Sequence, residues 1–298
     1  MKSVITEIQQ GNIKSLARAI SLVENETDGF EGILQSLPPK TNKPIIGITG
    51  PPGAGKSTLV DVLISKLATD EKRVAVLCVD PSSPFNFGAL LGDRIRMSNW
   101  FTKPNVFIRS LATRGALGGL HPKIIEITEL LQSAAFDYII VETVGVGQSE
   151  VEIAGLADVT VVVVVPEAGD EVQTMKAGLM EIADIFVVNK ADRPNADLFV
   201  KNLQLMLAPA FHAHSDPVPI IKTVASESKG IDELAGKINE MIQKHLNNDH
   251  RFWLLTERAY QLIEKNRMKN VDKEEMRKKI ESLYQSGEFN LYSFVKEY

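Results

Sequence analysis

Short apolar runs alternate with segments of helical periodicity through most of this chain. From about Lys43 onward, runs rich in valine and isoleucine are separated by stretches in which apolar residues recur every three or four positions. The runs are continuous and do not alternate with polar residues, which is typical of strands buried on both faces of a parallel sheet. The predicted strands cover residues 44–49, 73–79, 105–110, 137–142, 159–165, 184–188 and 218–224.

Helical segments lie between these strands and give the chain its order. They cover residues 57–69, 121–135, 172–182, 195–207 and 231–246. Strands and helices that alternate in this way predict a doubly wound α/β fold, in which ligands bind at the carboxyl ends of the strands. We therefore expect a mainly parallel sheet of about seven strands with helices on both faces.

Two flanking segments fall outside this alternation. Residues 1–40 contain a helical repeat of apolar residues from Leu16 to Val23, so we expect a helical segment that packs on the following domain. Residues 41–247 hold the α/β domain. Residues 248–298 carry two further helical patterns with an apolar stripe, which indicates packing within the chain or a contact between two copies of it.

The first predicted strand leads into a glycine-rich turn. Its residues match the pattern G-x-x-x-x-G-K-[ST] at every fixed position: Gly50, Pro51, Pro52, Gly53, Ala54, Gly55, Lys56 and Ser57, with Thr58 following. Glycine lets successive backbone N–H groups turn toward phosphate oxygens, and the N-terminus of the following helix adds partial positive charge. Lys56 can reach the β- and γ-phosphates, and Ser57 can bind Mg²⁺. The turn predicts a nucleoside triphosphate site.

A second motif follows the strand predicted at 184–188. Asn189, Lys190 and Asp192 match N-K-x-D, in which the aspartate accepts hydrogen bonds from N1–H and the exocyclic amine of guanine. Adenine does not offer this pair of donors. The motif therefore indicates a guanine nucleotide, GTP or GDP.

Acidic residues near the ends of other strands offer ligands for a metal ion. Glu142 ends an apolar strand, and Gly145 follows it three residues later. Asp80 follows another strand, and Asp93 lies in the loop beyond. Each acid taken singly could cap a helix or lie in a solvated loop. Together with the hydroxyl of Ser57, they form the oxygen-rich set that Mg²⁺ prefers.

The composition is that of a soluble globular protein, with 298 residues, 44% hydrophobic and 24% charged. The net charge of -5 gives no electrostatic reason to expect a nucleic acid or an anionic membrane as partner. No apolar stretch reaches the length of a membrane span. The one cysteine, Cys78, lies in an apolar strand and cannot form an internal disulfide, which favours a buried thiol and a cytoplasmic location.

Together with several longer strings, these motifs resemble the MeaB/ArgK family of P-loop GTPases, which belongs to the SIMIBI class. The strings are Val79–Ser83, Gly92–Met97, Arg109–Gly115, Glu142–Glu150 and Gly169–Glu171 with Lys176. Several of them are more specific than the phosphate loop alone. The resemblance covers the predicted α/β domain throughout and is compatible with both helical ends.

The resemblance implies a GTPase that acts as a chaperone for adenosylcobalamin-dependent acyl-CoA mutases, chiefly methylmalonyl-CoA mutase. GTP binding and hydrolysis would gate loading of the cofactor and protect the mutase. Carried across by motif, Lys56 would hold phosphates, Asp93 and Glu142 would act with Mg²⁺ in the switch network, and Lys176 would lie in a segment that senses the partner. A homodimer through the C-terminal helices is also expected.

Two positions depart from the family's pattern. Ala225, Ser226 and Glu227 stand where a loop that supports the guanine base usually reads Ser-Ala-x, although a backbone N–H there would still be able to serve the base. Glu167 stands before Ala168 where a small residue is expected. A charged side chain at that position would alter the mobility of the switch segment.

Three other classes of function stay open. A metallochaperone GTPase for metalloenzyme maturation would need His and Cys ligands, and His212 and His214 form the one close pair. A small-molecule kinase or an ATPase linked to basic amino-acid transport would need an acceptor pocket and a base. A structural binder with an inactive nucleotide site is disfavoured by the complete set of Lys56, Ser57 and acidic residues.

Overall fold

The computed structural model describes most of the chain, which divides into two compact units. Unit 1 comprises Met1–Asn248 and unit 2 comprises Asp249–Tyr298. The described residues are 2–39, 43–80, 97–114, 120–143, 145, 149–167, 180, 182–207, 217–244, 249–268 and 271–296. The N-terminal helices belong to unit 1.

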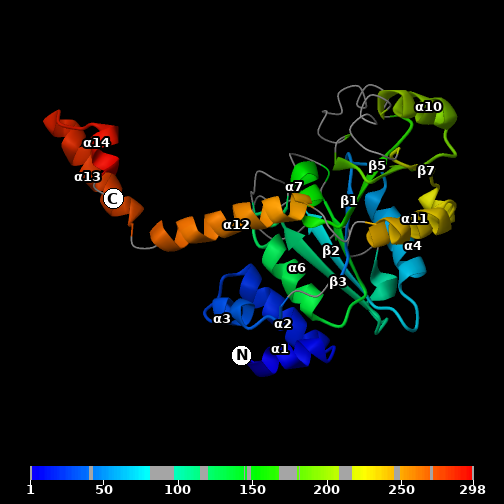
Figure 1. Ribbon diagram of the computed structural model, residues 1–298, viewed down its shortest axis with the longest axis horizontal. Helices are drawn as coiled ribbons and strands as arrows, with labels where there is room; N and C mark the ends of the chain where they lie inside the picture. Colours follow the sequence, from blue (N-terminus) through cyan, green and yellow to red (C-terminus); the bar gives the residue numbers. More distant parts are fainter. Residues whose placement is uncertain are drawn as a thin grey trace. The chain divides into compact units, whose positions relative to one another are not determined.

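Unit 1 is built on a seven-stranded sheet in which all neighbouring strands are parallel. The strands are β1 (Ile45–Thr49), β2 (Val74–Asp80), β3 (Val106–Ala112), β4 (Tyr138–Glu142), β5 (Val159–Val164), β6 (Ile185–Val188) and β7 (Ile220–Lys222). Their order is β3-β2-β4-β1-β5-β6-β7 (Figure 1). The chain passes from β1 to β2 and β3, returns to β4 beside β1, and continues through β5, β6 and β7 on the other side, so the ligand edge is centred on the end of β1. The predicted α/β fold is confirmed, and each strand lies within two residues of its prediction.

The central strands are apolar because helices cover both faces of the sheet. On one face Ile46 and Ile48 share a core with Leu59 of α4 (Lys56–Leu67) and Leu234 of α11 (Ile231–Lys244). On the other face α7 (Ser149–Leu156) approaches β1 so closely that a Cβ atom on Gly47 would lie 2.6 Å from Ile153. Each fully buried leucine or isoleucine contributes about 1.5–3 kcal/mol relative to an exposed one. Burial on both faces therefore holds the site's framework rigid.

The other helices of unit 1 surround this framework. They are α1 (Lys2–Gln9), α2 (Ile13–Glu24), α3 (Phe30–Gln35), α6 (Ile124–Ser133) and α10 (Ala196–Leu207), with 3₁₀ turns η1 (Ser98–Trp100) and η3 (Ala225–Glu227). The sequence pattern identified α2 but did not resolve α1, α3 and α7 as separate helices. Most of the helix predicted at 172–182 lies outside the described residues, as do His212 and His214.

The N-terminal helices pack on one face of unit 1, as expected. Leu16, Ile20 and Val23 of α2 are fully or almost fully buried, and α2 contacts α6 and the other two N-terminal helices. Asn12 caps α2, because its side-chain oxygen accepts hydrogen bonds from the backbone of Lys14 and Ser15. The α2 helix is therefore an integral layer of unit 1.

The described residues of unit 2 form three helices, α12 (Asp249–Arg267), α13 (Lys273–Ser286) and α14 (Leu291–Val295). The first two match the predicted helical patterns, and α14 is an addition. Phe294 is the one buried side chain among those of unit 2 whose burial is described, and its ring lies 6.0 Å from that of Phe289. Among the helices that the structure describes, none is long and apolar enough to cross a membrane.

A buried histidine before α6 makes the stability of unit 1 depend on pH. The side chain of His121 is almost fully buried, and its Nδ1 accepts a hydrogen bond of 3.0 Å from the backbone N–H of Lys123. Burial lowers the pKa of His121 to about 4; the nearby charges of Glu24 and Glu126 raise it, and those of Arg114 and Lys123 lower it further. Because its usual pKa is about 6.5, the unfolded chain binds a proton at a higher pH than the folded protein does.

The folded state should therefore lose stability as the pH falls from about 6.5 towards 4. In His121→Asn the amide oxygen can still accept from Lys123, but no imidazole remains to titrate. Between about pH 7.5 and about pH 5, we expect Tm to fall less for the variant than for the parent protein. Thermal unfolding followed by circular dichroism measures this. Equal losses of Tm in the two proteins would contradict the assignment.

Candidate functional site

The glycine-rich turn connects the central strand β1 to α4, as predicted. Gly55 is the N-cap of α4 and has a φ of 86°, in the left-handed region that favours glycine. A Cβ atom there would lie 2.5 Å from the side-chain nitrogen of Asn189, so the close approach also requires glycine. Lys56 and Ser57 open the helix, where backbone N–H groups lack partners within the helix. The turn thus presents an anion-binding helix end at the ligand edge of the sheet.

The ammonium group of Lys56 is held by backbone carbonyls of the same turn. Nζ donates to the oxygen of Gly50 at 2.8 Å and to that of Pro51 at 3.1 Å, and the side chain is buried. Gly145 lies against this ammonium group. A Cβ atom on Gly145 would lie 2.2 Å from the Gly50 oxygen and 2.5 Å from Lys56 Nζ. The glycine after β4 and the phosphate loop therefore meet at the lysine.

Ser57 and Glu142 are brought together because β4 lies beside β1. The Ser57 hydroxyl donates to Oε1 of Glu142 at 2.7 Å, and both side chains are buried. Beside them, at the ends of the same two strands, the hydroxyl oxygens of Thr49 and Thr143 lie 2.9 Å apart. The sequence analysis missed this threonine pair, which fastens the ends of the two strands. The predicted proximity of the serine and the glutamate is present.

Asp80 lies at the same edge, one strand further out. It ends β2 and is buried, and β2 pairs with β4 in a register that puts Cys78 opposite Glu142. Cys78 is a buried thiol that forms no disulfide, as predicted. The other two predicted site residues, Asp93 and Lys176, lie outside the described residues.

Asn189 joins three loops at the predicted base site. Its side-chain nitrogen donates to the Ala54 oxygen at 2.9 Å, in the phosphate loop. Its oxygen accepts from the Thr223 hydroxyl at 3.1 Å and from the Ala225 backbone N–H at 3.2 Å. The side chain is almost fully buried. Asn189 therefore has a structural function in which every polar atom of its amide is used within the protein.

Lys190 adds a further contact between the two motifs. Its Nζ donates to the Gly53 oxygen at 2.8 Å, and its backbone φ of 56° is unusual for a residue with a side chain. Two residues later Asp192 is exposed to solvent. The turn thus holds the lysine against the phosphate loop and leaves the carboxylate of Asp192 accessible.

The unusual Glu167 has a partner that the sequence analysis did not identify. It lies after β5 and forms an ion pair with Arg193, the residue that follows Asp192. The hydrogen bond from Arg193 lowers the pKa of the Glu167 carboxyl. The glutamate thus connects the end of β5 to the turn that carries the N-K-x-D motif. Its signal in the sequence was a charged residue where the family pattern expects a small one.

Comparisons with known proteins place the chain in a family. The family model described as "Methylmalonyl Co-A mutase-associated GTPase MeaB" matches residues 16–281. A Pyrococcus abyssi protein named as a candidate GTPase is 48% identical over 279 residues, which are 91% of this chain and 81% of that protein. The GTPase ArgK of Escherichia coli is 37% identical over 77% of this chain and 72% of its own length.

A solved structure shares the fold. The crystal structure of an LAO/AO transport system kinase aligns with 99% of this chain and 95% of its own, at a TM-score of 0.65 and 26% identity. The family match includes the phosphate loop, the N-K-x-D turn and the strands between them. The resemblance inferred from the motifs is confirmed, and the chain belongs to the MeaB family of GTPases.

Proposed function

We propose that this GTPase is a chaperone for an adenosylcobalamin-dependent acyl-CoA mutase, methylmalonyl-CoA mutase in the first place. Its nucleotide cycle would gate loading and protection of the mutase's cofactor. The match of residues 16–281 to a family model named for association with that mutase carries this proposal. The packing of Gly145 against the phosphate loop supports it, because a γ-phosphate bound beside Lys56 would lie next to this glycine. A cytoplasmic location is consistent with the single, buried thiol of Cys78.

Hydrolysis moves the γ-phosphoryl group of GTP to water and releases GDP. In our proposal the phosphate oxygens replace the carbonyls of Gly50 and Pro51 as partners of Lys56. A charged donor held in a buried site stabilises the negative charge that develops in the transition state. Lys56 thus exchanges neutral acceptors for anionic ones.

We propose that Ser57, Asp80, Asp93 and Glu142 form the Mg²⁺ network. The described members suit a hard cation, because Ser57 and Glu142 place two buried oxygens 2.7 Å apart. When bound, the metal ion would neutralise phosphate charge. The chain's own contribution is to hold these oxygens at the ends of adjacent strands.

We propose that Asp192 reads the guanine base. Asn189 and Lys190 hold its turn against the phosphate loop, while the carboxylate of Asp192 is exposed. In the Ala225–Glu227 turn, the N–H of Ala225 donates to Asn189, so the N–H of Ser226 is the next donor along the turn for the base oxygen. The departure from Ser-Ala-x thus leaves a backbone donor in place.

Lys56→Ala should lower GTP turnover by about 10²–10³-fold, because it removes a charge-stabilising donor from the site. Lys66→Ala is the matched control: this lysine lies on the same helix and pairs with Asp232 at the surface. Steady-state phosphate release measures turnover, and circular dichroism verifies folding. Turnover in Lys56→Ala equal to that of the control would refute the proposed role.

Asp192→Asn should weaken GTP binding by about 1–3 kcal/mol, because it leaves polar groups of the base unpaired. Xanthosine triphosphate should bind the variant better than GTP does, because its base presents a carbonyl in place of the amine. Asp197→Asn serves as the control, since Asp197 is also exposed and pairs with Lys222 at 2.8 Å. Calorimetry compares the affinities. ATP and GTP binding equally to the parent protein would exclude guanine reading.

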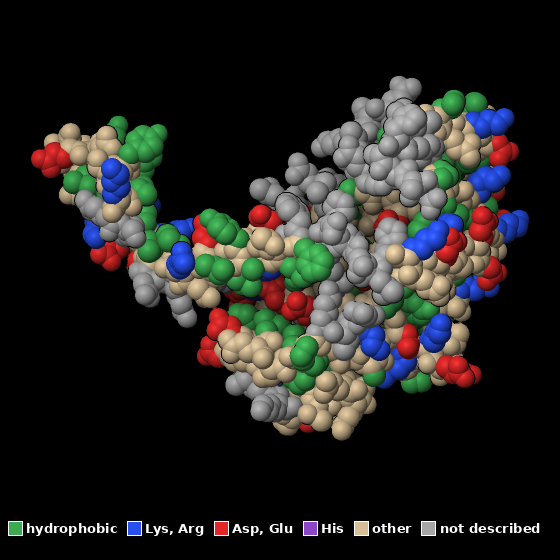
Figure 2. Space-filling model, in the orientation of Figure 1, with side chains coloured by type: hydrophobic (Ala, Val, Ile, Leu, Met, Phe, Trp, Pro, Cys, Tyr) green, Lys and Arg blue, Asp and Glu red, His purple; other side chains and the backbone are tan. Residues whose placement is uncertain are grey.

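Unit 2 supports the proposal of a homodimer. Exposed apolar residues lie on all three of its helices (Figure 2), including Phe252, Ile263 and Tyr292. Met268, Val271, Met276 and Ile280 line a groove of about 500 Å³ within this unit. A unit of this size with so few buried side chains needs apolar cover, and a second copy of the same helices would supply it.

GTP turnover should rise when the mutase from the same organism is added, because a partner would order the switch segments. The gain should stay below the 10³–10⁵-fold that an arginine finger supplies. Lys176→Ala should lose the acceleration, whereas Lys201→Ala, on the exposed side of α10, should retain it. Light scattering of the same samples reports the mass of the complex and of the free dimer. Unchanged turnover together with no complex in any nucleotide state would refute the partner.

A kinase is the second candidate, favoured by the structural likeness to an LAO/AO transport system kinase. The two functions differ in where the γ-phosphate goes. A hydrolase releases one inorganic phosphate for each GDP formed, whereas a kinase acting on arginine would release less. Measuring both products in the presence of arginine separates them. The metallochaperone alternative depended on His212 and His214, which lie outside the described residues.

A further inference from the structure

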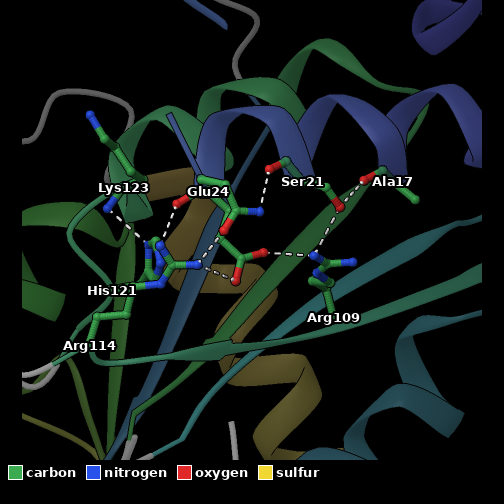
Figure 3. Close-up of polar contacts among 8 residues, drawn as sticks. Ala17, Ser21, Glu24, Arg109, Arg114, His121 and Lys123 are labelled. Carbon is green, nitrogen blue, oxygen red and sulfur yellow. Dashed lines mark hydrogen bonds and ion pairs between the residues drawn. The ribbon is translucent and has the colours of Figure 1, made fainter. Parts of the chain in front are cut away.

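The carboxyl ends of α2 and β3 are joined by a cluster that we call the α2–β3 latch, formed by Glu24, Asn25, Arg109 and Arg114. Arg109 donates to Oε2 of Glu24 at 2.7 Å, and Arg114 lies 3.4 Å from Oε1. Arg114 also donates to the Glu24 backbone oxygen at 2.9 Å and to Oδ1 of Asn25 at 2.7 Å. Figure 3 shows the two arginines reaching Glu24 from opposite sides.

The latch is more buried than most ion pairs among the described residues, although the pair of Lys123 with Glu126 is more buried still. The side chain of Glu24 is 13% exposed, and those of Arg109 and Arg114 are 28% and 34% exposed. Taking a carboxylate out of water has a large cost, which close and multiple hydrogen bonds must offset. The apolar contacts of Leu16, Ile20 and Val23 already attach α2 to unit 1. Because burying these charges is costly and α2 is already attached, the cluster suggests a function other than holding α2 on unit 1.

Arg114 has a backbone conformation that the latch maintains. Its φ is 49°, in the left-handed region, which costs a residue with a side chain about 1–3 kcal/mol. The guanidinium of Arg114 donates three hydrogen bonds to residues at the end of α2. His121 beside this cluster stays neutral near pH 7, since burial lowers its pKa to about 4, so the two arginines supply the positive charge that faces Glu24. The strained turn therefore depends on groups from the N-terminal helices.

The residue before Arg114 contacts the proposed metal network. The backbone N–H of Thr113 donates to the Asp80 backbone oxygen at 3.0 Å, and Ala112 lies opposite Asp80 in the β2–β3 register. Asp80 itself is buried at the ligand edge of the sheet. A continuous path thus runs from Glu24 through Arg114 and Thr113 to Asp80.

We propose that Glu24 and Asn25 are positioning residues for GTP hydrolysis: by holding Arg114 in its left-handed conformation, they set the position of Asp80 in the site. This inference rests on the proposed function of Asp80 in the Mg²⁺ network. The N-terminal helices then take part in catalysis at a distance. A displacement of about 1 Å at such a group can cost up to 10²-fold in rate.

Lys123, the N-cap residue of α6, contacts the same N-terminal segment and offers a matched control. Its Nζ lies 2.6 Å from Oε1 of Glu26 and 5.3 Å from the centre of the Phe30 ring. These contacts tie the segment to the start of α6 and involve no residue of the latch. Loss of Lys123 should therefore weaken packing of the N-terminal helices without moving Asp80.

The test compares Glu24→Gln, Asn25→Ala and Lys123→Met in the full chain. For Glu24→Gln we expect kcat to fall about tenfold and the Mg²⁺ concentration for half-maximal activity to rise severalfold, with KM for GTP changed less than twofold. Asn25→Ala, which removes one of the three hydrogen bonds of the Arg114 guanidinium, should shift the same two quantities less, and it provides a test if Glu24→Gln does not fold. Glu24→Asp, which retains the charge, should recover part of the loss. Lys123→Met should lower Tm but leave kcat and the Mg²⁺ dependence unchanged.

Asp80→Asn tests the metal function of Asp80 separately from the positioning function of the latch. If it changes kcat and the Mg²⁺ dependence while Glu24→Gln and Asn25→Ala lower only Tm, the latch is simple packing and the inference is overturned. If Asp80→Asn leaves both quantities unchanged, the metal function of Asp80 is wrong and the proposed path from the latch has no endpoint. Matching effects of Asp80→Asn and Glu24→Gln support the inference.

Discussion

The buried ammonium group of Lys56 is the charge around which the nucleotide site is arranged. A buried charge is stable only where hydrogen bonds replace its lost hydration. The carbonyls of Gly50 and Pro51 supply these bonds, and their approach requires a turn with little side-chain bulk. Gly145 closes the far side, where a Cβ atom would meet both the ammonium and the turn. The site therefore contains a cation already positioned by neutral partners, which phosphate oxygens replace in the proposed nucleotide complex.

The loops around Lys56 are held by a second buried polar side chain, whose hydrogen-bonding groups must also be satisfied. Asn189 uses its whole amide to join the phosphate loop to the turns after β6 and β7. An amide in a dry environment that lost one of these partners would cost about 1–3 kcal/mol. The turn proposed to read the base and the phosphate loop are thus mechanically linked, because the same buried side chain positions both. This linkage explains how an exposed Asp192 can have a defined position.

The Glu167–Arg193 ion pair and the cluster of Glu24 with two arginines differ in burial and therefore in strength. Glu167 and Arg193 are both about half exposed, and such pairs contribute about 0–1 kcal/mol. A contact this weak can break and re-form as the nucleotide changes. The pairing of Glu24 with Arg109 and Arg114 is largely buried, and losing one partner there would leave an uncompensated charge. It suits a permanent connection between the N-terminal helices and the end of β3.

The sequence by itself determined the α/β fold, the phosphate loop, the N-K-x-D turn and the family, because each depends on local patterns. Continuous apolar runs predict a buried parallel sheet, and such a sheet brings its loops to one edge, so the pairing of Ser57 with Glu142 could be anticipated. Only the tertiary structure decided which charges pair across long separations. Glu24 lies 85 residues from Arg109, and the partner of Glu167 is 26 residues away. Such pairs depend on how helices and loops pack in space. Contacts between residues far apart in the sequence produce no periodic pattern from which they could be predicted.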